Sequence, residues 1–170
     1  MSPVGADAWY SSALLTTLIL QGVVNKNDNL PEQPDIFPRD RIESIDIAQP
    51  KPPLRVLELG SGAKGLPGFA AAVTLSFLSK RFPSWTVTMT DNNTDCLAQL
   101  KLNVESNRHK ILPIDTDEGD REINVDFLDW GDDLYGDNSR LLNARVVIGS
   151  ELVYTSETAH ALVDVLSALL

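Results

Sequence analysis

Residues 54–68 read Leu-Arg-Val-Leu-Glu-Leu-Gly-Ser-Gly-Ala-Lys-Gly-Leu-Pro-Gly, an apolar stretch that runs directly into a glycine-rich turn. One acid, Glu58, interrupts the apolar stretch two residues before the first glycine. Gly60, Gly62 and Gly65 permit a sharp turn and let a ligand approach bare backbone. The pattern predicts a strand, a tight turn and a helix whose first N–H groups have no partner within the helix. We interpret this stretch as a nucleotide-type binding site.

The acid in this stretch narrows the class of nucleotide. In dinucleotide-binding turns a phosphate lies over the helix N-terminus, and a carboxylate so close would repel it. The Glu58 carboxylate suits a ligand that carries an ammonium or sulfonium cation and no phosphate, which describes S-adenosylmethionine. The spacing of the glycines also matches nicotinamide-dependent oxidoreductases, which carry an acid about 20 residues further on. The corresponding acid, Asp91, comes later than that, so the oxidoreductase is the less favoured alternative.

Length and composition are those of one globular domain. The chain has 170 residues, of which 43% are hydrophobic and 22% charged, as is usual for a soluble protein with a real core. No stretch approaches the roughly 18 apolar residues that cross a bilayer. The single cysteine, Cys96, excludes an internal disulfide and favours a reducing compartment. We therefore expect no membrane association and a location in the cytoplasm, or in the cytoplasm and the nucleus.

The charge balance bears on the partner. The formal net charge is −10, which argues against nucleic-acid binding because phosphate contacts need clustered Lys and Arg. A basic or Lys-bearing protein would be attracted at long range. Solubility alone is the alternative explanation of the charge.

Three segments differ in composition. Residues 1–24 are expected to hold an N-terminal helix, over about 8–24, with a stripe of leucines at helical spacing. Residues 25–53 hold six prolines among Asn, Asp and Gln and predict a long loop or linker. Residues 54–170 alternate strand and helix patterns, which predicts parallel βαβ units and an open α/β sheet with helices on both faces. The expected strands are 55–59, 85–90, 123–128 and 144–149, and the expected helices are 66–80, 95–107 and 156–170.

The carboxyl ends of such strands meet at one rim, where ligands bind. Each predicted strand brings a polar or acidic group to that rim. These groups are Glu58 with its glycines, Asp91, Asp129 with Trp130, and Glu151 with Tyr154. His109 and His160 lie outside the rim, and no His/Cys spacing suggests a metal site.

Each rim residue also has a structural interpretation. Asp91 could cap the following helix instead of accepting hydrogen bonds from two ribose hydroxyls. Trp130 could belong to the core instead of stacking on an adenine ring. Glu151 could be a solvated or paired carboxylate, and Tyr154 a half-buried amphipathic residue. The sequence leaves these alternatives open.

Taken together, the motifs resemble the seven-β-strand S-adenosylmethionine-dependent methyltransferases, and in particular their eukaryotic protein-lysine methyltransferase branch. The more diagnostic parts are the Leu-Asp-Trp and acid-x-x-Tyr steps, because the whole superfamily shares the glycine motif. The matching segments are Val-Leu-Glu-Leu-Gly-Ser-Gly (56–62), Thr-Asp (90–91), Leu-Asp-Trp-Gly (128–131) and Gly-Ser-Glu-Leu-Val-Tyr (149–154). The resemblance implies a Rossmann-like, mostly parallel sheet.

The resemblance also implies roles for the rim residues. Asp91 would hold the ribose, Asp129 and Trp130 would contact the adenine, and Glu151 and Tyr154 would line the acceptor side near the transferred methyl group. The residues that would shape the methionine pocket are Glu58, Gly60, Gly62 and Gly65.

Three departures from the family pattern stand out. Lys64 lengthens the glycine turn by one residue, and Glu151 stands where the family usually has Asp. The family continues with three more strands after the helix that ends at Leu170, so we expect a C-terminally truncated domain that lacks the last strands of the fold.

We therefore expect methyl transfer from S-adenosylmethionine to a protein side chain, with lysine favoured and histidine open. The substrate would be a basic or Lys-bearing protein. Two alternatives remain: a non-catalytic methyltransferase-like fragment that binds the cofactor or a partner, and an NAD-dependent oxidoreductase.

Overall fold

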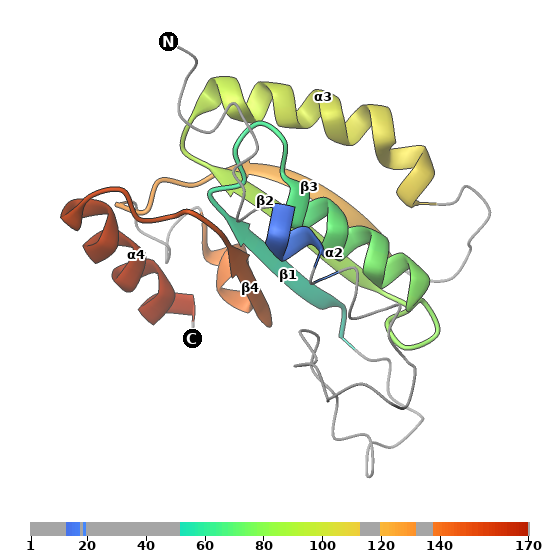
Figure 1. The fold of residues 1–170 in the computed structure, drawn as a ribbon. Helices are drawn as coiled ribbons and strands as arrows, with labels where there is room; N and C mark the ends of the chain where they lie inside the picture. The colour runs from blue at the N-terminus through green and yellow to red at the C-terminus, as the bar shows by residue number, and fades with distance from the viewer. Residues whose placement is uncertain (1–12, 18, 20–51, 113–119, 132–137, 170) are drawn as a thin grey trace.

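The fold is a parallel sheet with helices on both faces (Figure 1). A computed structural model of the chain describes residues 13–17, 19, 52–112, 120–131 and 138–169. The strands are β1 (Leu54–Leu59), β2 (Trp85–Asp91), β3 (Arg121–Phe127) and β4 (Val146–Gly149). The helices are α2 (Leu66–Phe77), α3 (Thr94–Ile111), the 3-10 helix η2 (Ser139–Asn143) and α4 (Ser156–Leu169). The four described strands lie in the order β3-β2-β1-β4 and all are parallel, which confirms the Rossmann-like prediction.

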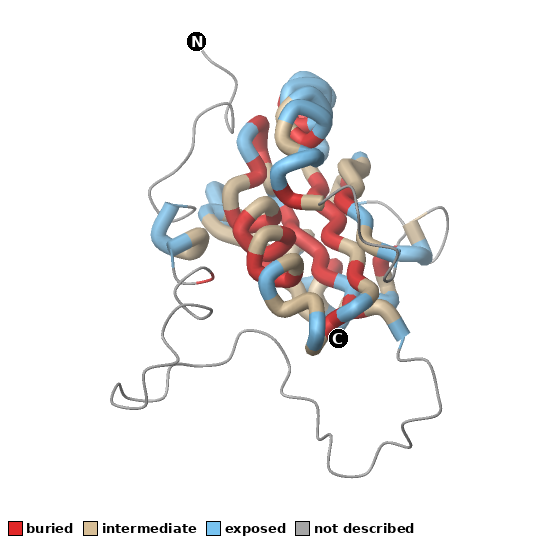
Figure 2. Tube along the Cα trace, turned by 90° about the vertical axis from the view of Figure 1, so that its right-hand side faces the viewer, coloured by how far each residue is buried: buried red, intermediate tan, exposed pale blue. Residues whose placement is uncertain are grey.

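Alternation along the strands separates two apolar layers. In β1, Leu54 and Val56 face the first layer, whereas Leu57 and Leu59 face the second. Successive side chains in a strand point to opposite faces of the sheet, so this alternation decides which residues each face buries. Figure 2 shows the buried residues concentrated in the centre of the described part. The sheet is therefore the shared wall of two cores.

The first layer is the larger and lies under α2 and α3. Trp85, Val87 and Met89 of β2 are fully buried there, together with alanines of α2 and Leu100 of α3. Small residues on α2 let that helix approach the sheet closely. Ile19, from the described part of the predicted N-terminal helix, is also buried in this layer.

The second layer covers only half of its face. Leu57, Leu59 and Leu128 pack there against Leu141 of η2 and Val165 of α4. Over β2 and β3 the same face carries polar residues such as Thr88 and Asn124 and is hollowed by a cleft of about 450 Å³. Arg140 of η2 closes one side of this cleft through an ion pair with Asp126, at 2.9 Å.

Most predicted elements are confirmed, with shifted ends. Helix α2 ends at Phe77, not near Lys80, because the chain turns at Leu78, whose carbonyl accepts bonds from Arg81 and Phe82. Helix α3 runs to Ile111, one turn beyond the predicted end at 107. Helix α4 begins at the predicted residue, Ser156, and buries Val165 and Leu169.

The prediction for the fourth strand is partly wrong. The sequence predicts a strand over 144–149 and, from its apolar run, burial on both faces, but β4 begins at Val146 and only Ile148 is buried. The reason is its place in the sheet: among the described strands, β4 pairs with β1 alone. A strand at the edge of a sheet has a neighbouring strand on one side only, so its residues are less buried than those of a central strand.

Part of the predicted N-terminal organisation lies outside the described residues. Of the helix expected over 8–24, residues 13–17 and 19 are helical. Of the loop expected over 25–53, the structure describes only 52 and 53. Within the described residues, no helix has the length and apolar character that crossing a bilayer requires.

Candidate functional site

The carboxyl ends of the four parallel strands bring the predicted site residues to one end of the sheet. The glycine turn follows β1, Asp91 ends β2, Asp129 and Trp130 follow β3, and Glu151 follows β4. In an open parallel sheet this end is where ligands bind, next to the point at which the strand order reverses. Here the reversal lies between β1 and β4.

Glu58 is buried beneath the first turn of α2. Its side chain is 2% exposed, and its Oε2 accepts a hydrogen bond from the backbone N–H of Gly68 at 3.1 Å. Glu58, predicted to lie at the rim with its glycines, therefore lies at that end of β1 but beneath α2. Glu58 has the same parity as Leu54 and Val56, so its side chain points to the face that α2 covers.

Burial sets the ionisation of Glu58. It raises the pKa of the carboxyl to about 7, with Asp91 adding a smaller effect in the same direction. The Ser61 hydroxyl and the Gly68 N–H oppose this by favouring the ionised form. Near neutral pH this carboxyl is poised between its two states.

The Glu58 contact changes what the start of α2 can bind. A helix N-terminus binds phosphate through the free N–H groups of its first turn. Pro67 has no N–H, and the N–H of Gly68 is already bonded to Glu58. The N-cap residue, Gly65, has no side chain with which to cap the helix and is in the left-handed conformation, with φ 52°. Of the three first-turn positions, two therefore offer no free N–H group to a pyrophosphate.

Gly68 is required by this packing, and its substitution gives a first prediction. A Cβ atom on Gly68 would lie 2.5 Å from Glu58 Oε2 and 2.5 Å from Met89 Cγ. Gly68→Ala should therefore lower the free energy of unfolding by about 1–3 kcal/mol, although alanine favours helices by about 1 kcal/mol. Urea denaturation measures this.

Gly131→Ala is the matched control, because its Cβ would meet only Asp129 Oδ1, at 3.5 Å. Equal stability of the two variants would contradict the close packing of Glu58 under α2.

Asp91 holds the glycine turn. Its Oδ2 accepts the N–H of Gly62 at 2.8 Å, and its Oδ1 accepts the N–H of Asn93 at 2.9 Å. The alternative role as a helix cap is wrong: Asn93 is the N-cap of α3 and accepts from Asp95 and Cys96. The part-buried Asp91 carboxylate faces the turn, and an ionised carboxylate has more lone pairs than these two bonds use.

Further backbone contacts fix the same turn. Ser61 N donates to Thr90 O at 2.9 Å and Gly65 N donates to Ser61 O at 3.0 Å. Asn103 Nδ2, on α3, donates to Ala63 O at 2.9 Å. Gly60 and Gly62 have φ of 61° and 59°, which other residues rarely adopt. The turn is therefore built in one conformation before any ligand arrives.

Asp129 and Trp130 lie beside the turn. Asp129 Oδ1 accepts the N–H of Gly131 at 3.0 Å, which closes a small loop after β3. Trp130 is half-buried and packs against the second apolar layer, and its Cζ2 would lie 3.9 Å from a Cβ on Gly60. The core role and a ligand-facing role are thus compatible, since one side of the ring is packed and part of the residue is open.

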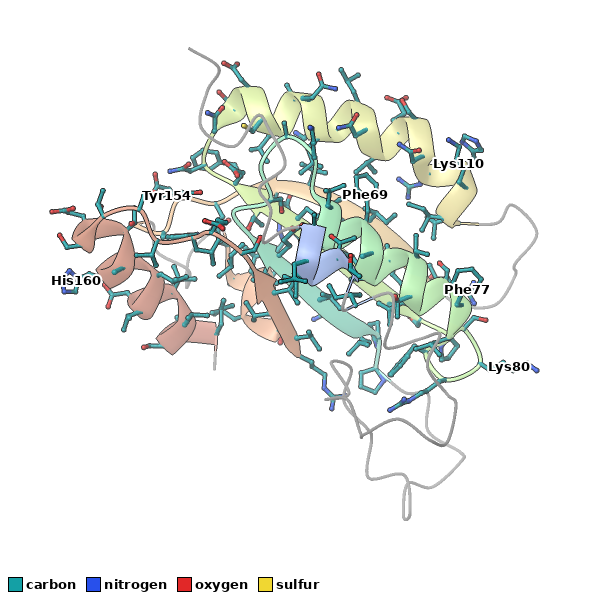
Figure 3. The ribbon with its side chains drawn as sticks, in the orientation of Figure 1. Phe69, Phe77, Lys80, Lys110, Tyr154 and His160 are labelled. Carbon is teal, nitrogen blue, oxygen red and sulfur yellow. The ribbon has the colours of Figure 1, made fainter. Side chains whose placement is uncertain are left out.

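Glu151 and Tyr154 lie on the segment between β4 and α4. Glu151 is exposed, and among the described non-glycine residues it alone has a positive φ, of 56°. Tyr154 is 55% exposed, and Figure 3 shows it near the start of α4, with His160 on the outer side of that helix. Burial raises the pKa of the Tyr154 phenol, and the charges of Glu151 and Asp91 raise it further. Groups from β2 and from the β4–α4 segment therefore meet at this rim.

Other titratable groups stand apart from the site. His109 and His160 are exposed on helices, and Lys64 is exposed on the turn. Cys96 is buried at the start of α3, where burial and then Asp91 and Asp95 raise the pKa of its thiol. Within the described residues, no group of three or more His, Cys, Asp or Glu side chains could hold a metal ion.

Sequence reasoning missed three residues of the site. Gly68 could have been found, because a glycine inside a helix usually has a packing reason. Leu152, which packs on the turn, is an apolar residue in a polar segment. Asn103 gave no signal, since a polar residue on an exposed helix is ordinary.

Comparison with known proteins agrees with this geometry. A family model described as lysine methyltransferase matches residues 2–170, whereas a comparison with curated proteins gave no match. The parallel sheet, the glycine turn after β1 and the acid that ends β2 are the arrangement of a methyltransferase with a Rossmann-like fold. Such enzymes transfer a methyl group to lysine in a protein substrate. Because the match extends over nearly the entire sequence, the chain belongs to the lysine methyltransferase family.

Proposed function

We propose that S-adenosylmethionine is the methyl donor and binds at the rim formed by the glycine turn, Asp91 and Trp130. One observation carries the proposal: Glu58 Oε2 accepts a hydrogen bond from the N–H of Gly68 at 3.1 Å, and the preceding residue, Pro67, has no N–H. This helix start offers little to a pyrophosphate. A ligand with cations and no phosphate gains from the carboxyl beneath the turn, so the arrangement favours S-adenosylmethionine over NAD.

The chain's own groups suit the parts of this ligand. Gly60 and Gly62 present bare backbone next to the Asp91 carboxylate, which can accept bonds from two ribose hydroxyls with its remaining lone pairs. Trp130 supplies an aromatic surface of the kind that stacks on adenine, and Asp129 a carboxylate beside it. When bound, the donor supplies an electrophilic methyl group on a sulfonium.

We assign the acceptor side to Glu151 and Tyr154. The exposed Glu151 carboxylate would attract the lysine ammonium and, through water, take the proton that the amine must lose. Tyr154, like any tyrosine, keeps its phenol proton near neutral pH, and its raised pKa acts in the same direction; its oxygen can accept a bond from the amine. Methyl transfer redistributes charge and creates none, so the main task of these groups is positioning.

The substrate is proposed to be a basic or Lys-bearing protein in the cytoplasm, or in the cytoplasm and the nucleus. The net charge of −10 would attract such a protein and repel nucleic acid. The two carboxylates at the rim, Asp91 and Glu151, place part of that charge where the amine must arrive.

The proposal predicts both the ligand and the product. Calorimetry should show binding of S-adenosylhomocysteine and no binding of NAD. Incubation with methyl-labelled S-adenosylmethionine and a cytosolic lysate should place label on protein, and hydrolysis should release it as methyl-lysine. Label recovered as methyl-histidine or in nucleic acid would overturn the substrate assignment. Binding without any transfer would mark a fragment that holds the cofactor only.

A further inference from the structure

The segment between β4 and α4 carries both proposed acceptor groups, and one apolar residue in it points back to the glycine turn. A Cβ atom on Gly60 would lie 2.7 Å from Leu152 Cδ2, and one on Gly149 would lie 2.6 Å from Leu152 Cδ1. The leucine therefore fills the space that these two glycines leave open. We call this space, bounded by Gly60 and Gly149, the glycine notch.

We infer that Leu152 is a positioning residue that seats in the glycine notch and thereby fixes Glu151 and Tyr154 against the cofactor turn. The inference rests on the proposed function, since it concerns how the acceptor side of that site is held. Leu152 lies between the two acceptor groups in the sequence. In this role it acts on the reaction through its neighbours and not through contact with ligand or substrate.

The backbone around Leu152 supports this role. Glu151 has φ 56°, a conformation that costs a non-glycine residue of order 1 kcal/mol or more unless its surroundings impose it. The chain leaves β4 at Gly149 and turns at Glu151, and Leu152 then packs with Trp130 on the second apolar layer. Burial of the leucine side chain in the notch offsets the cost of the turn.

The other end of the segment is fixed independently. Tyr154 N and Thr155 N both donate to Thr158 Oγ1, at 3.1 and 3.0 Å, and Thr155 Oγ1 accepts from Thr158 N at 3.2 Å. Thr155 thus caps α4. With Leu152 in the notch and Tyr154 tied to α4, Glu151 has little freedom.

The next residue in the chain, Val153, differs from Leu152 in its exposure and contacts. Val153 is 55% exposed, whereas Leu152 is half-buried in the notch. Two adjacent aliphatic residues therefore differ in what they contact, which provides a matched control within the segment.

Leu152→Ala should slow methyl transfer while sparing the cofactor site. A misplacement of about 1 Å can cost up to 100-fold in rate, so we expect the initial rate at saturating methyl-labelled S-adenosylmethionine to fall about 10- to 100-fold. The Kd of S-adenosylhomocysteine should change less than about threefold, because Asp91 and the turn keep their own bonds. Leu152→Met, of similar volume, should restore the rate, and Val153→Ala should leave it unchanged.

A double-variant cycle isolates the notch. Gly149 does not have a positive φ, and a Cβ atom on it would lie 2.6 Å from Leu152 Cδ1 but 3.3 Å from the backbone Leu59 O, so Gly149→Ala should mainly push Leu152 out. It should slow transfer in the wild-type background and have little further effect in Leu152→Ala, because coupled residues are not additive. Equal effects in both backgrounds, or a loss of S-adenosylhomocysteine binding that parallels the loss of rate, would overturn the inference. If Leu152→Ala does not fold, Gly149→Ala and Leu152→Met decide alone.

A readout without turnover separates this inference from the proposed function. With Tyr10 and Tyr135 replaced by phenylalanine, ultraviolet titration reports the phenol of Tyr154. Burial and, to a smaller extent, the charge of Glu151 raise the pKa of that phenol. Leu152→Ala loosens the segment that holds both groups and should lower this pKa, whereas Val153→Ala should not. An unchanged pKa in Leu152→Ala would overturn the inference even if the wild type transfers methyl groups. If Leu152→Ala lowers the pKa of the phenol but the wild type shows no transferase activity, the positioning role of Leu152 is upheld and the proposed function is refuted.

Discussion

Asp91→Ala should abolish measurable binding of S-adenosylhomocysteine. The carboxylate accepts the N–H of Gly62 at 2.8 Å and that of Asn93 at 2.9 Å, and it is proposed to hold the ribose. Hydrogen bonds to a charged group contribute about 1.5–3 kcal/mol each, and about 1.4 kcal/mol corresponds to a factor of ten. Loss of the bond to the turn together with the ribose bonds should weaken binding at least about 100-fold in calorimetry.

Two variants separate the ligand role of Asp91 from its structural role. Asp91→Asn keeps one carbonyl oxygen for the turn but loses an acceptor, so its affinity should fall between those of the wild type and the alanine variant. Asp95→Ala removes an exposed acid from the first turn of α3 and should leave the affinity unchanged. Wild-type affinity in Asp91→Ala would remove this residue from the site.

Local patterns in the sequence predict much of the fold. The apolar run of β1, the period-two alternation in β3 and the glycines after Leu59 place the strands and the turn, because these signals depend only on neighbouring residues. The position of β4 at an edge was not available in the same way. Its apolar run is typical of a strand covered on both faces, whereas burial depends on which strand lies beside it.

The site shows the same division. Parallel strand direction follows from helix–strand alternation, so the meeting of Asp91 with the turn at one end of the sheet could be predicted. The depth of Glu58 could have been read from its parity with Val56, yet its bond to Gly68 needs the distance between β1 and α2. The left-handed backbone of Glu151 depends on Leu152 reaching Gly60, a contact between segments about 90 positions apart. Long-range packing of this kind has no local signal.

Glu58→Gln should make the chain more stable at neutral and alkaline pH. The wild-type pKa is about 7 in the folded chain against 4.5 for the ordinary carboxyl. Below pH 4.5 both states are protonated, and between 4.5 and about 7 the folded chain keeps a proton that the unfolded chain releases. The free energy of unfolding therefore falls as pH rises through this window, by roughly 3 kcal/mol in all at about 1.4 kcal/mol per pKa unit.

Glutamine is neutral at every pH and can still accept the Gly68 N–H through its amide oxygen. Its stability advantage over the wild type should thus grow by roughly 2–3 kcal/mol between pH 5 and pH 8 in urea denaturation. Glu105→Gln, on the exposed side of α3, removes the same charge without burial and should show no such growth. A constant difference across this pH range would mean that Glu58 is ionised in the folded chain. The carboxylate would then lie ready for a cation at every pH, and the increased stability of the glutamine variant would have to come from another source.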